Sequence, residues 1–249
     1  MKYINTLTAK FIDRPNRFIA HVELDDGSIE TVHVKNTGRC RELLIPGVEV
    51  VIQDAYSDTV VDITRKANQC IISNYNPERK TRYDLISVYK KNMGWINIDS
   101  QVPNKVVNEW LHCDNHLFNN LTFIKPEYKY GDSRVDFYLE DETKEGIKKI
   151  LMEVKGCTLE IGGKGYFPDA PTKRGAKHLK ELSDAVKKGY DCYLVFVIAM
   201  NGIDEVHANV EMDPDFGEAL EKAKRSGVKV INLPCLVTGE TIITKKDSI

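Results

Sequence analysis

The first third of the chain is patterned as a series of short β-strands. Apolar side chains occupy every second position in residues 18–24, and an Asp-Asp-Gly-Ser turn signal separates them from a second alternating run at 29–35. Several short strands around one short helix are typical of a small closed barrel of the oligonucleotide-binding (OB) type. The remaining elements predicted for this barrel are strands at 48–52, 59–63 and 69–73 and one helical turn at 39–44.

The pattern changes to helical spacing after residue 76. Apolar residues in 81–91 and 104–111 recur three or four positions apart, and Pro103 stands at the start of the second run. We therefore expect residues 76–125 to be a mainly helical connection. On this interpretation an OB-like barrel domain spans residues 1–80, and an α/β domain spans residues 81–249.

The second half of the chain predicts a mixed sheet with helices on its faces. Its most apolar stretch, residues 192–200, is typical of a central parallel strand that is buried on both sides. Asp213-Pro214 is a helix start, and Gly227 is the corresponding stop. The other predicted elements are strands at 135–139, 150–155 and 228–233, a charged turn at 140–146, a glycine-rich loop at 156–165 and an amphipathic helix at 173–189.

Two of these strands carry the candidate chemistry. Asp136 lies in the first, and Glu153 and Lys155 lie in the second, two positions apart and therefore on one face. Two carboxylates suit a hard cation such as Mg²⁺, or Mn²⁺ in its place, and a nearby lysine can stabilise charge that develops on a phosphate. The alternative is a solvated hairpin whose opposite charges pair across the strands.

Composition and charge narrow the class of protein. The 249 residues are 42% hydrophobic with a net charge of −2, which excludes a wholly basic nucleic-acid coat but allows a local basic face. Such a face is predicted between 164 and 190, where seven Lys and Arg outnumber three Asp and Glu. We find no membrane-length apolar run and no signal peptide, and the six scattered cysteines are interpreted as reduced thiols, so we expect a cytoplasmic protein.

Motifs along nearly the whole chain resemble one known family. With Asp136 and Glu153-Val154-Lys155 in its motif positions, the second half is similar to the PD-(D/E)XK nuclease-like fold, and Glu127 falls where that fold often has an acidic residue on an upstream helix. The chain as a whole resembles the sugar fermentation stimulation protein A (SfsA) family. The matching stretches are Arg14 to Phe18, Asn36-Thr37-Gly38-Arg39, Glu42-Leu43-Leu44 with Pro46-Gly47, Glu127 to Gly131, Ser133 to Phe137, Glu153-Val154-Lys155, Phe167 to Thr172, Arg174-Gly175 and Lys177-His178-Leu179.

The resemblance implies an N-terminal OB-like domain, a nuclease-like C-terminal domain and DNA binding with a regulatory role in sugar metabolism. We expect Asp136 and Glu153 to hold the cation, joined by Glu127 through water, and Lys155 to act in catalysis if the protein cleaves DNA. Little sequence preference is expected, because no recognition-helix motif is present. The residues expected to contact DNA are Lys173, Arg174, Lys177 and His178 on the basic helix and Arg14, Arg17 and Arg39 on the barrel.

Three functions remain open from the sequence. The first is a DNA-binding protein that uses a nuclease-like core without turnover. The second is a divalent-metal-dependent nuclease or phosphodiesterase. The third is a sugar or small-molecule binding module whose barrel holds the ligand, and a homodimer is compatible with all three.

Overall fold

The computed structural model describes residues 1–36, 38–56, 59–62, 69–72, 78–113, 115–118, 120–131 and 133–245, with only the backbone for 59–62 and 69–72. It divides into two compact units. One comprises Lys2–Ser100 with Thr238–Thr241, and the other comprises Met1, Gln101–Val237 and Ile242–Ile249. The ends of two predicted strands, Ile63 and Ser73, lie outside the described residues, as does Thr37.

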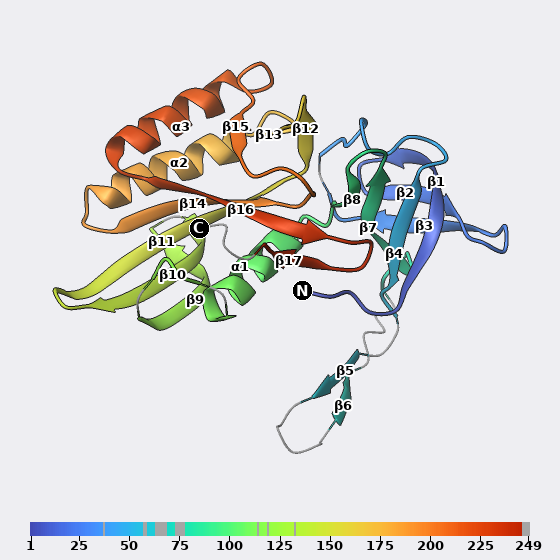
Figure 1. Cartoon of the computed structure of the whole chain (residues 1–249), viewed down its shortest axis with the longest axis horizontal. Helices are drawn as coiled ribbons and strands as arrows, with labels where there is room; N and C mark the ends of the chain where they lie inside the picture. Colours follow the sequence, from blue (N-terminus) through green and yellow to red (C-terminus); the bar gives the residue numbers. More distant parts are fainter. Residues whose placement is uncertain are drawn as a thin grey trace. The chain divides into compact units, whose positions relative to one another are not determined.

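The first unit is the predicted OB-like barrel (Figure 1). Its strands follow the order β3-β2-β1-β4-β7-β8, and a parallel pairing of β3 with β7 closes the sheet on itself. Ala20, Val22, Val32 and Val34 alternate with more exposed residues and are completely buried, as the sequence pattern predicted. The strands are β1 (Thr6–Asn16), β2 (Ile19–Glu23), β3 (Ile29–Val34), β4 (Glu49–Asp54), β7 (Tyr83–Lys90) and β8 (Gly94–Asn97).

The strands that form this barrel differ from those predicted. The two expected at 59–63 and 69–73 are β5 (Thr59–Asp62) and β6 (Gln69–Ile72), which form a separate two-stranded sheet. Their places are taken by β1, which was not predicted, and by β7, which was predicted as the helix 81–91. The helical interpretation of β7 is wrong because Tyr83–Val88 is buried on both faces between neighbouring strands. A strand that is buried on both faces lacks the alternation that would distinguish it from a helix.

The boundary between the two units lies later in the chain than predicted. Because β7 and β8 belong to the barrel, the chain passes from one unit to the other after Ser100 rather than after residue 80. The single turn predicted at 39–44 is present, since the amide of Leu44 donates to the carbonyl of Cys40. The predicted helix at 104–111 is also confirmed as part of α1 (Val102–Cys113).

The second unit is built on a sheet of strand order β17-β16-β14-β11-β10-β9. The central strand β14 is parallel to both of its neighbours and is buried along almost its whole length, as predicted. The other neighbouring pairs in this sheet are antiparallel. The strands are β9 (Leu121–Tyr130), β10 (Ser133–Thr143), β11 (Gly146–Cys157), β14 (Asp191–Ile198), β16 (Lys229–Val237) and β17 (Ile242–Thr244).

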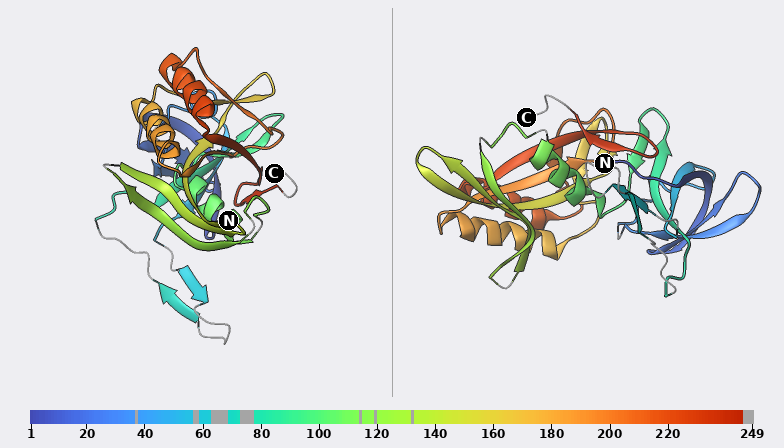
Figure 2. Two further views of the ribbon diagram at one scale, coloured as in Figure 1. Left: turned by 90° about the vertical axis from the view of Figure 1, so that its left-hand side faces the viewer. Right: turned by 90° about the horizontal axis from the view of Figure 1, so that it is seen from below.

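Helices cover both faces of this sheet (Figure 2). On one face, α2 (Lys173–Val186) and α3 (Pro214–Ser226) pack through Leu179, Leu182 and Leu220 onto a core that includes Leu151 and Leu194. On the other face, Trp110 of α1 contacts Phe118, which in turn contacts Tyr193 of β14. The N-terminal part of each helix approaches β11, α1 through Pro103 beside Gly156 and α2 through His178, which bonds to Glu153.

Two local predictions in this unit need correction. The glycine-rich stretch 156–165 is not a loop, because it forms the end of β11 and a hairpin of β12 (Leu159–Ile161) and β13 (Lys164–Phe167), which pairs with β15 (Val206–Ala208). Gly162 and Gly163 serve its turn with positive φ angles. The expected charged turn at 140–146 is also shorter, since β10 and β11 remain paired as far as Thr143 and Gly146.

Candidate functional site

The carboxylate of Asp136 lies where β10 and β11 separate. The last residues paired between these strands are Phe137 and Met152, so Asp136 and Glu153 follow directly beyond the ladder. The backbone amide of Val154, freed from that ladder, donates to Oδ2 of Asp136 at 2.7 Å. The end of the pairing therefore creates the space and the donor that hold this carboxylate.

The second partner of Asp136 comes from helix α1. Nδ2 of Asn104 donates to Oδ1 of Asp136 at 2.8 Å. This contact depends on a close approach of the first turn of α1 to β11, because a Cβ at Gly156 would lie only 2.8 Å from Cγ of Pro103. Sequence reasoning missed Asn104, although its place beside a helix-starting proline was a signal.

Glu153 is the most buried acidic residue of the site. It is only 2% exposed and faces α2, where Nδ1 of His178 hydrogen-bonds to its Oε1. Nζ of Lys155 donates to the same oxygen, and Nε of Arg174 donates to Nε2 of His178 at 3.3 Å. Since Nε2 accepts this bond, the ring proton is on Nδ1 and is donated to Glu153. A chain of hydrogen bonds thus connects exposed Arg174 with buried Glu153.

The pKa values of Asp136 and Glu153 are shifted in opposite directions. Burial, followed by repulsion from Glu153, raises the pKa of Asp136, against the stabilising donors Val154 and Asn104 and the charge of Lys155. Burial also acts to raise the pKa of Glu153, but the hydrogen bond from His178 and the charge of Lys155 outweigh it, so the net shift is downward. Glu153 is therefore held as the anion, whereas ionised Asp136 is stabilised by an added cation.

The carboxylate oxygens of Asp136 and Glu153 suit a small hard cation that is only partly coordinated by protein. In the described part of the chain no cluster of three or more His, Cys, Asp or Glu residues could enclose a metal ion. The donors from Lys155 and His178 both reach Oε1 of Glu153. A Mg²⁺ or Mn²⁺ ion is commonly held by one or two carboxylates with water and phosphate oxygens, which is the set that Asp136 and Glu153 supply.

Glu127 does not occupy the helical position expected for it. It lies in β9 with a φ of 54°, across from Asp136 in a register that pairs Tyr128 with Val135. Its carboxylate forms an ion pair with Nε of Arg134 at 2.6 Å, and both side chains are largely exposed. The helical neighbour of Asp136 is instead Asn104, and a water-mediated role for Glu127 remains a prediction.

The residues expected to contact DNA separate into two kinds. Lys173, Arg174 and Lys177 are exposed at the start of α2, but His178 is buried against Glu153. On the barrel, Arg17 and Arg39 are exposed, whereas the guanidinium of Arg14 is bound to backbone carbonyls. His178 and Arg14 are thus placed to position other groups rather than to meet a phosphate.

Comparison with known proteins identifies the family. The model of the sugar fermentation stimulation protein RE domain matches residues 101–241, and that of the SfsA N-terminal OB domain matches residues 12–98. The chain is 51% identical to the sugar fermentation stimulation protein homolog of Clostridium beijerinckii, with 97% of this chain and 96% of the relative covered. It is 49% identical to the Desulfitobacterium hafniense homolog, with 97% and 94% covered. The protein belongs to the SfsA family.

A solved structure supports the same assignment. The structure of Pyrococcus furiosus SfsA in complex with Ca²⁺ is 28% identical to this chain, with a TM-score of 0.75 over 99% of this chain and 96% of that one. The predicted order of an OB-like barrel followed by a mixed-sheet α/β unit is confirmed. No helix in the described ranges combines the length and the apolar character needed to cross a membrane.

Proposed function

We propose that this protein binds DNA through its phosphates, with a divalent cation at Asp136 and Glu153. The observation that carries the proposal is the pair of carboxylates where β10 and β11 separate. Glu153 is held as the anion by His178 and Lys155, and burial and repulsion from Glu153 raise the pKa of Asp136. A cation there would offer its remaining positions to phosphate oxygens, and the chemistry that it supplies is neutralisation of their charge. The related P. furiosus protein was solved with Ca²⁺, which supports a cation in this family.

Helix α2 supports the choice of DNA as the partner. Lys173, Arg174 and Lys177 are exposed near its N-terminus, and its first turn has no acidic residue. Arg174 is connected to Glu153 by hydrogen bonds through His178, so the cationic side chains of α2 begin close to the carboxylate site. Binding through phosphates predicts little sequence preference. The relatives' name points to sugar fermentation, and regulation of sugar metabolism through DNA is the corresponding biological role.

Removal of the α2 cations tests this proposal. The Lys173→Ala/Arg174→Ala/Lys177→Ala variant is expected to bind all duplex sequences more weakly and by similar factors, with a salt dependence shallower by about 0.9 for each phosphate that is no longer neutralised. Electrophoretic mobility shifts over a salt series, with and without Mg²⁺, measure both quantities. Lys222→Ala/Lys224→Ala on α3 is the matched control, since these exposed lysines pair with Glu218 and Glu221.

Unchanged affinity and slope in the triple variant would contradict a DNA surface on α2. Binding of sugars but not DNA by the wild type would favour the binding-module alternative instead. A homodimer stays a prediction, which the mass of the protein in solution tests.

Cleavage of DNA is the second candidate function, and one contact favours it. Lys155 hydrogen-bonds to Glu153 on the strand that also supplies the Val154 amide to Asp136, which is the arrangement expected of a nuclease E-x-K motif. Positive charge beside a phosphate favours a transition state in which negative charge grows. Loss of supercoiled plasmid in Mg²⁺ or Mn²⁺ distinguishes cleavage from binding alone.

A further inference from the structure

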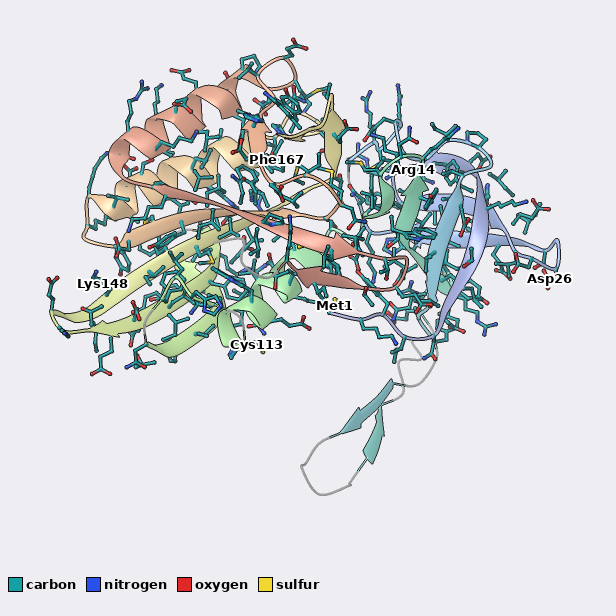
Figure 3. The ribbon with its side chains drawn as sticks, viewed as in Figure 1. Met1, Arg14, Asp26, Cys113, Lys148 and Phe167 are labelled. Atoms are coloured by element: carbon teal, nitrogen blue, oxygen red, sulfur yellow. The ribbon has the colours of Figure 1, made fainter. Side chains whose placement is uncertain are left out.

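The side chain of Arg14 connects two loops of the barrel through hydrogen bonds. The guanidinium of Arg14, labelled in Figure 3, donates to four backbone carbonyls. Nη2 reaches the carbonyls of Arg17 and Asn36, each at 2.7 Å, and Nη1 reaches those of Gly38 at 2.9 Å and Arg39 at 2.7 Å. The turn between β1 and β2 and the segment after β3 are therefore held against one planar group.

This clamp brings particular side chains to one rim of the barrel. Because one guanidinium reaches the carbonyls of both Arg17 and Arg39, these two exposed residues start from neighbouring points. Phe18 follows Arg17, and exposed Arg41 follows two positions after Arg39. We call Arg17, Phe18, Arg39 and Arg41 the Phe18 rim.

Phe18 has a fixed backbone and an exposed ring. Its amide donates to Oδ1 of Asn16 at 2.9 Å, and its carbonyl accepts from the amide of Val34 at 2.8 Å. Its surface is nevertheless 52% exposed. An exposed apolar residue is ordinary by itself, but here its hydrogen-bonded backbone directly follows Arg17, whose carbonyl shares the guanidinium of Arg14 with that of Arg39. Glu42 is the exposed acidic residue nearest in sequence to Arg41, and the three rim arginines outnumber it.

We infer that the Phe18 rim binds an unpaired nucleotide of single-stranded DNA. The ring offers a face on which any base can stack, and the guanidinium groups offer partners for the flanking phosphates. Bases within a duplex are already stacked and are not free to meet the ring, so the unpaired strand is the form that fits. Arg14 is a positioning residue, because both of its Nη nitrogens donate to carbonyls. This inference rests on the proposed function, because it takes DNA as the ligand. It adds the Phe18 rim as a second binding site and a preference for single-stranded over duplex DNA.

The test uses fluorescence anisotropy with an oligothymidylate of about 15 nucleotides and a duplex of the same length. Phe18→Ala is expected to weaken binding of the single strand about tenfold or more and to change duplex binding less than about twofold. Ile29→Ala is the matched control, since Ile29 is 68% exposed on the same barrel but precedes Glu30 rather than arginines. It should leave both affinities unchanged.

A strand with abasic sugars isolates the stacking contact. Wild type should bind this probe more weakly than oligothymidylate, and Phe18→Ala should weaken its binding no further, because no base remains to stack. The inference is overturned if Phe18→Ala binds oligothymidylate as tightly as wild type, if it weakens both DNA forms equally, or if it weakens the abasic strand as well. Those outcomes leave DNA binding itself intact, whereas a wild type that binds neither DNA form overturns the proposed function too.

Discussion

If the protein cleaves DNA, the Lys155→Ala variant is expected to do so at least about 100-fold more slowly than wild type in Mg²⁺ or Mn²⁺, the scale seen when one electrostatic stabiliser is removed. Lys155 is mostly buried, donates to Glu153 and stands on the face of β11 that carries this carboxylate. Its charge therefore lies beside the place where cation and phosphate would meet. Interactions that strengthen only in the transition state change the rate more than the affinity, so DNA binding should fall only slightly.

Single-turnover cleavage of plasmid and of single-stranded DNA measures this effect. Lys149→Ala is a suitable control, because Lys149 lies on the same strand but is exposed and paired in register with Glu140. Cleavage that survives Lys155→Ala undiminished would contradict the assignment of the lysine. No cleavage by wild type would leave DNA binding as the whole activity, and Lys155 as a structural partner of Glu153.

The His178→Ala variant is expected to bind Mn²⁺ about tenfold more weakly than wild type. Partners that orient a metal ligand typically change metal affinity by about 10- to 100-fold when they are removed. His178 donates its Nδ1 proton to Glu153, and this bond is the leading favourable contribution that lowers the pKa of that carboxyl. Without it, burial of the Glu153 anion is less compensated and the carboxylate is free to turn.

A conservative variant separates this positioning role from simple packing. Asn at position 178 offers an amide nitrogen near the place of Nδ1, so His178→Asn should recover most of the Mn²⁺ affinity, whereas His178→Leu fills the space but should not. Mn²⁺ titrations followed by electron paramagnetic resonance measure the free ion directly. Equal affinities for the Asn and Leu variants would show that His178 contributes only volume.

Alternation and helix signals predicted much of the second unit but only part of the barrel. The buried run of β14 and the start of α3 at Asp213 both follow from local rules, since a two-sided strand must be apolar and a helix start needs a side-chain acceptor. The β7 prediction failed because its apolar residues fit helical spacing equally well. Only pairing with β3, β4 and β8, which are distant or later in the chain, decided between the two structures.

The candidate site was predicted in its residues more than in its contacts. Glu153 and Lys155 lie on one strand face, as their spacing of two positions implied, and Asp136 accepts from the amide of Val154 between them. The roles of Asn104, His178 and Arg14 depend on side chains that meet backbone or carboxylate groups from other elements. A basic or polar residue in a motif gives no local sign of whether it faces solvent or completes such a contact.

The shift in unfolding temperature caused by Mn²⁺ tests the central claim most directly, when wild type is compared with Asp136→Asn. At Mn²⁺ tenfold above its Kd, one site adds about 1.4 kcal/mol, or about 3–6 °C for a protein of this size. Asn at position 136 can keep both hydrogen bonds if the amide of Asn104 turns over. Because burial raises the pKa of Asp136, its ionisation at pH 7 costs stability, and the metal-free variant should be at least as stable as wild type. We predict a rise of this size for wild type and none for Asp136→Asn, and an equal rise in both proteins would contradict a cation site at Asp136 and Glu153.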